Sequence, residues 1–102
     1  MLVVVALFEL HIEFAQSLKD KRMVVKSLRD KLRHRFEISA AEVGLQDVHQ
    51  RARLAVSFIV LEHAAADSRL DKIVDFIESN TDATLSGWTT EKLEFDEEAG
   101  LS

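Results

Sequence analysis

Apolar and polar residues alternate at the start of the chain, over residues 2–14. The apolar positions are Phe8, Leu10, Ile12 and Phe14, and the polar positions between them are Glu9, His11 and Glu13. A period of two predicts a β-strand with one buried face. Residues 3–7 are apolar at every position, which indicates a central strand whose second face is also partly covered.

A helix is predicted over residues 17–36. Ser17 has the side chain of an N-cap residue, and Asp20 stands three positions later, where a capping-box partner belongs. The apolar residues that follow recur at spacings of seven, three, four and four: Leu18, Val25, Leu28, Leu32 and Phe36. This spacing places them on one face of the helix.

The rest of the chain predicts three more strands and one more helix. Residues 38–43 indicate a short strand, and residues 52–60 alternate without interruption and predict a longer one. A second helix is expected over residues 63–79. A last strand is expected over residues 84–95, with Gly87 at a bulge. We expect one domain over residues 1–95 and an acidic, flexible tail over residues 96–102.

The predicted order of elements is β-α-β-β-α-β. Right-handed crossovers then place two helices on one face of a four-stranded antiparallel sheet, which is the ferredoxin-like α+β arrangement. The other sheet face stays open. We expect it to carry apolar residues that favour a second copy of the chain as a covering partner; they are Val3, Val5, Leu7, Ala55 and Ile59.

Composition is that of one globular domain, since the 102 residues are 47% hydrophobic and 30% charged. The absence of cysteine excludes disulfides, thiolate metal sites and a cysteine nucleophile. Neither a signal-peptide pattern nor an apolar run of about 18–20 residues is present, so we expect a cytoplasmic protein outside the membrane. A net charge of −5 argues against affinity for nucleic acid over the whole surface, but a local basic patch remains open.

The predicted first helix is strongly basic. Residues 17–36 contain eight basic and two acidic side chains, a net charge of +6. Five of the cations fall within an arc of roughly 80° on the helix: Lys19, Arg22, Lys26, Arg29 and Arg33. We call these five residues the basic stripe. A row of this kind suits a phosphate backbone, and Lys21 would help to hold an anion at the start of the helix.

Two alternatives remain open for this helix. The second helix carries four acids, Asp67, Asp71, Asp75 and Glu78, which could pair with part of the stripe and leave only surface electrostatics. Lys21 points toward the apolar side, where it could extend its ammonium group to solvent or serve a ligand.

Other polar groups are weaker candidates. Glu9, His11 and Glu13 share one predicted strand face, but alternate strand residues lie about 6.6–7 Å apart, a long reach for three ligands of one metal. For Arg51 and Arg53 the expected ion-pair partner is Asp47. We expect no cofactor and no enzyme activity, because the chain shows no nucleophile motif and no glycine loop for phosphate. With a single tryptophan and no predicted aromatic pair on the open face, single-stranded RNA is not expected to stack there.

Several short segments together resemble a known family. They are Ala15–Arg22, Ala41–Val43, Gln46–Asp47, Gln50–Ala52 and Asp71–Glu78. In combination they are similar to the YlxP-like family of small bacterial proteins, assigned to a domain of unknown function, over residues 2–95. The resemblance implies a ferredoxin-like fold and a bacterial cytoplasmic protein encoded near genes of transcription elongation, translation initiation and ribosome maturation. It implies no catalytic residue.

Two functions follow from these observations. The first is an accessory protein that binds structured RNA or a ribosomal subunit through the basic stripe and Lys21. The second is a homo-oligomeric interaction or regulatory module that uses the open sheet face and binds no nucleic acid.

Overall fold

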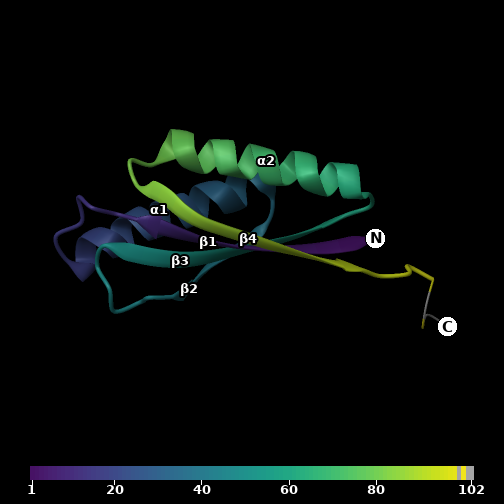
Figure 1. Cartoon of the computed structure of the whole chain (residues 1–102), viewed down its shortest axis with the longest axis horizontal. Coiled ribbons are helices and arrows are strands. Elements are labelled where there is room, and N and C mark those ends of the chain that lie inside the picture. The colour runs from purple at the N-terminus through teal and green to yellow at the C-terminus, as the bar shows by residue number, and fades with distance from the viewer. Residues whose placement is uncertain (99, 101–102) are drawn as a thin grey trace.

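The computed structural model describes residues 1–98 and 100. Its elements are β1 (Leu2–His11), α1 (Leu18–Phe36), β2 (Ser39–Gly44), β3 (Arg51–Val60), α2 (His63–Asn80) and β4 (Thr84–Glu94). The strands form one antiparallel sheet in the order β2-β3-β1-β4. Both helices lie on the same side of this sheet (Figure 1). The predicted ferredoxin-like α+β fold is therefore confirmed.

The core lies between the sheet and the helices. The even-numbered residues of β1 from Leu2 to Leu10 point into it and are buried, as are Leu28 and Leu32 of α1 and Ile73 and Ile77 of α2. The Phe8 ring stacks on Trp88 with ring centroids 5.4 Å apart. The alternation read from the sequence thus identifies the buried face of β1.

The first strand is shorter than predicted. It ends at His11, and residues 13 and 14 form a turn closed by the Ala15 N–H bonding to the Ile12 carbonyl at 3.0 Å. Placing Phe14 on the buried face was wrong, because Phe14 is 49% exposed. The chain has to reverse here to start α1, and the turn carries Phe14 out of the sheet.

Capping fixes the start of α1. The Ser17 hydroxyl accepts a hydrogen bond from the Asp20 N–H at 3.1 Å, and the Asp20 carboxylate accepts one from the Gln16 N–H at 3.0 Å. The first bond satisfies the N–H of Asp20, one of those that a helix start leaves without a partner, and the second satisfies the N–H just before the cap. The predicted N-cap is confirmed, and it sets where the basic side chains of α1 begin.

The last strand contains the predicted irregularity. Glu9 lies opposite Gly87 while Leu10 lies opposite Leu85, so Ser86 is an extra residue on β4. Beyond the strand, the Phe95 N–H bonds to the Met1 carbonyl at 2.8 Å. Of the predicted tail, residues 99, 101 and 102 lie outside the described residues, and the predicted flexibility of the segment stays a prediction.

Candidate nucleic-acid interface

The basic stripe lies on the flank of α1 that faces the β2 edge of the sheet. Arg33 marks this flank, since its Nη2 donates to the Ala40 carbonyl on β2 at 2.5 Å. The other flank of α1, with Val24 and Ser27, borders a hollow that is completed by the end of α2 at Asn80. The stripe therefore faces away from α2.

The five side chains of the stripe differ in how free they are. Lys19, Arg22 and Lys26 are exposed, and no ion pair involves them in the described part of the chain. Arg29 is partly buried and lies 3.5 Å from Asp30. Arg33 uses one N–H on Ala40 and has further guanidinium donors to offer. Three cations are thus fully available and two are partly engaged.

Lys21 does not belong to this surface, and its assignment as an anion contact is wrong. Its side chain is fully buried, and its Nζ lies 3.0 Å from a carboxylate oxygen of Glu42 on β2. The same ammonium donates to three backbone carbonyls, of Leu45 at 2.7 Å, Arg51 at 3.3 Å and Gln46 at 3.4 Å. Lys21 points inward as its spacing predicts, but what it holds is the connection between β2 and β3.

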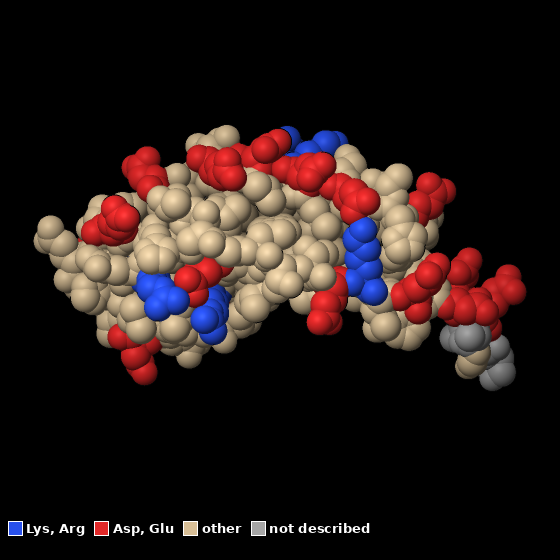
Figure 2. All heavy atoms as spheres, in the orientation of Figure 1, with Lys and Arg blue, Asp and Glu red and all other residues tan. Residues whose placement is uncertain are grey.

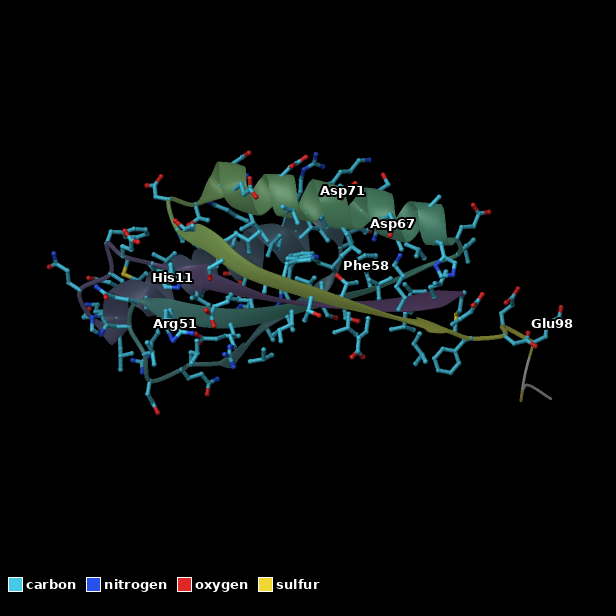
Figure 3. The ribbon with its side chains drawn as sticks, in the orientation of Figure 1. His11, Arg51, Phe58, Asp67, Asp71 and Glu98 are labelled. Carbon is cyan, nitrogen blue, oxygen red and sulfur yellow. The ribbon has the colours of Figure 1, made fainter. Side chains whose placement is uncertain are left out.

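The acids of α2 do not neutralise the stripe. Asp67 pairs with Lys92 of β4 at 2.5 Å, which places this acid on the β4 flank. Figure 2 shows acidic side chains gathered along α2, and Figure 3 shows Asp67 and Asp71 on that helix. Between α1 and α2 no ion pair occurs among residues 1–98 and 100.

The flank of α2 that faces the end of α1 carries side chains of both charges. Arg69 and Lys72 line a hollow there together with His34 and Arg35 of α1; Glu37 and Asp75 also contribute to its wall. The alternative in which α2 pairs with part of the stripe therefore finds no ion pair in the described structure. The stripe, marked by Arg33 at β2, and Asp67, paired with Lys92 of β4, lie on different flanks of the helix layer.

A second charged cluster lies on the open sheet face. Arg51 donates to both Glu9 carboxylate oxygens at 3.0 Å, and Arg53 Nε donates to one of them at 3.1 Å. The prediction that Asp47 pairs with these arginines is wrong, since their partner is Glu9. Glu9 lies directly opposite Arg53 in the β1–β3 register, so an acid on the neighbouring strand was the sequence signal that could have identified it.

This cluster gives a pH prediction. Hydrogen bonds from Arg51, and next from Arg53, hold the pKa of the Glu9 carboxyl below its ordinary value of 4.5. A lowered pKa adds stability that is present above pH 4.5 and is lost as pH falls through the lower, folded value. Urea unfolding should therefore show Glu9→Gln less stable than wild type at pH 7, with the gap closing at acid pH. Because the group is solvated, the gap should be small and should shrink with salt; a gap independent of pH would contradict the assignment.

The proposed metal ligands do not converge. Glu9 is engaged by two arginines, and Glu13 lies in the turn beyond the end of β1. Over residues 1–98 and 100, no group of three or more His, Asp or Glu side chains is arranged to hold a metal ion. In the same residues no helix is long and apolar enough to cross a membrane.

In the part of the chain that the structure describes, the open sheet face presents no aromatic pair. Phe8 and Trp88 stack on each other on the core side of the sheet. Of the described aromatic residues, only Phe95 continues the alternation of open-face residues on β4, and it lies just past the end of that strand. Base stacking of the kind used by sheet-based binders of single-stranded RNA therefore has no platform here. The geometry instead offers a helix-borne row of cations.

Comparison with known proteins identifies a family for the chain but assigns it no chemistry. The family described as "Protein of unknown function (DUF503)" matches residues 3–90. The chain belongs to this family. It is 31% identical over 65 residues to the uncharacterized protein YlxP of Bacillus subtilis strain 168, covering 64% of this chain and 71% of that protein. The YlxP-like resemblance of the sequence is thereby confirmed.

The match to the DUF503 family includes residues of all six elements of the fold, because it starts in β1 and ends in β4. It supplies no function that could be transferred, since the family and the Bacillus relative are both described without one. Any function must be argued from the surface of this chain.

Proposed function

We propose that the protein is a non-enzymatic accessory factor that binds the phosphate backbone of structured RNA through the basic stripe of α1. The observation that supports this most is the direction of the stripe. It faces the β2 edge, away from the acids of α2, and Lys19, Arg22 and Lys26 have no ion-pair partner in the described structure.

The dimensions of the stripe suit a nucleic-acid backbone. From Lys19 to Arg33 the helix rises about 21 Å, with a cation at nearly every turn. A phosphate contact gains affinity by releasing condensed counterions from the nucleic acid. A protein with net charge −5 can still bind in this way, because the potential at the contact decides the interaction.

Structured RNA suits this surface better than single strands. Double-stranded RNA is recognised mainly by its shape and its phosphates, which a rigid helix with basic side chains can contact. Over the described residues, the open sheet face lacks the aromatic pair that single-stranded recognition would need. Ribosomal subunits expose structured RNA of this kind, and the family resemblance implies a gene near those of ribosome maturation.

The test is the salt dependence of binding to a labelled RNA hairpin, measured by fluorescence anisotropy. With three to five phosphate contacts, the slope of log affinity against log salt should be about −2 to −4.5. An unpaired strand of the same composition should bind more weakly. Absence of binding at low salt, or an affinity independent of salt, would contradict the proposal.

A further inference from the structure

The sheet face opposite the helices is uncovered in the described part of the chain (Figure 1). The strand registers arrange its side chains in rows that cross the sheet. One row consists of Ile59 on β3, Val3 on β1 and Leu93 on β4. Ile59 is 61% exposed and Leu93 is 57% exposed, so this row forms an apolar ridge, which Phe95 extends beyond β4.

The next two rows have small side chains on the β2 side. Ser57 and Ala55 on β3 lie opposite Ser39 and Ala41 on β2. With Val5 beside them, these residues line a shallow hollow of about 400 Å³. One surface therefore carries both an apolar ridge and a neighbouring hollow floored by small residues.

We propose that this face packs against the same face of a second copy of the chain. A two-fold contact uses one surface twice, so that surface must be complementary to itself. A ridge beside a hollow meets this requirement, because each copy can place its Ile59 ridge over the Ala55–Ser57 hollow of the other. Removing the ridge from water supplies the driving force.

The charges on the face fit the same arrangement. At one end of the face, which we call the arginine end, Arg51 and Arg53 surround Glu9, so the cluster has a net charge of +1. Figure 3 shows Arg51 at one end of the sheet and Glu98 beyond the other. If the strands of the two copies run in opposite directions, the arginine end of each copy lies near the end of the other copy that carries Glu98. Glu91, on the edge strand β4, can stay solvated at the rim.

This inference does not depend on RNA binding. The basic stripe lies on α1, on the helix side of the sheet, and of its residues only Arg33 lines the hollow of the proposed contact. A dimer of this kind leaves Lys19, Arg22 and Lys26 of both copies accessible, because none of them lines that hollow. Failure of one proposal can therefore be distinguished from failure of the other by measuring mass and RNA affinity on the same samples.

The experiment is light scattering with analytical ultracentrifugation on the full chain and on two variants, Ile59→Lys and Ala55→Arg. The first puts a charge on the ridge and the second fills the hollow. Both positions face outward in the single chain, so circular dichroism should show both variants folded. Met23→Lys is the matched control, because Met23 is 64% exposed but lies on α1.

Wild type and Met23→Lys should have twice the 11.6 kDa mass of the chain, and both face variants should have the single-chain mass. A wild type that stays a monomer at about 1 mM, where even a millimolar dissociation constant leaves a measurable dimer, would overturn the proposal. So would dimers that survive both variants, or a larger assembly, since a two-fold face closes on two copies.

Discussion

Replacing Lys21 by methionine is expected to destabilise the fold by about 3–5 kcal/mol, the usual cost of removing one partner of a buried ion pair. The change leaves the Glu42 carboxylate, which is only 17% exposed, without its cation. It also removes the donor to the carbonyl oxygens of Leu45, Gln46 and Arg51. Urea unfolding at neutral pH measures the effect.

Lys26→Met is the matched control for this prediction. It makes the same chemical change on the same helix at an exposed position, and it should alter stability by no more than about 0.5 kcal/mol. Adding Glu42→Gln to Lys21→Met should restore part of the loss, because the unpaired buried charge is then removed. Equal stability of Lys21→Met and Lys26→Met would show that the buried ammonium is not a structural contact.

Reversing two charges of the basic stripe is expected to weaken RNA binding by about 100-fold or more at low salt, since two phosphate contacts become repulsions. The variant is Arg22→Glu with Lys26→Glu, which takes the net charge from −5 to −9. Both side chains are exposed and have no described ion pair, so folding should be unaffected. Hairpin anisotropy measures the affinity.

The matched control reverses the same number of charges away from the stripe. Lys31→Glu with Lys72→Glu also gives −9 at exposed positions on the remaining surface of the helix layer. It should lower affinity far less than the stripe variant, because neither side chain belongs to the stripe and only the longer-range attraction, which salt screens, is reduced. Equal losses in the two double variants would mean that net charge, and not the stripe, governs binding.

The sequence predicts the elements well where a local pattern determines them. Apolar alternation in β3 and the helical spacing in α1 both identify the correct buried face, and the Ser17 cap is visible as a residue type. The same reasoning failed at Phe14, which continues the alternation of β1 past its end. A strand pattern does not reveal where the chain reverses to begin the next helix.

The candidate site was harder to predict because it depends on contacts distant in sequence. The inward direction of Lys21 followed from helical periodicity, but three of its partners are backbone carbonyls 24 to 30 residues away, and these leave no mark in the sequence. Glu42 was missed for the same reason. Whether α2 neutralises the stripe depends on which flank of each helix faces the other, and this is fixed by packing on the sheet.

Co-sedimentation with purified bacterial ribosomal subunits tests the central claim most directly. Wild type and the Arg22→Glu/Lys26→Glu variant would be run on gradients at about 50 mM and about 200 mM salt, the range over which phosphate contacts weaken steeply. We predict that wild type migrates with a subunit at the lower salt and is largely released at the higher salt, while the variant stays at the top of both gradients. Wild type that fails to migrate with either subunit at low salt, or a variant that migrates as wild type does, would contradict binding of ribosomal RNA through the basic stripe.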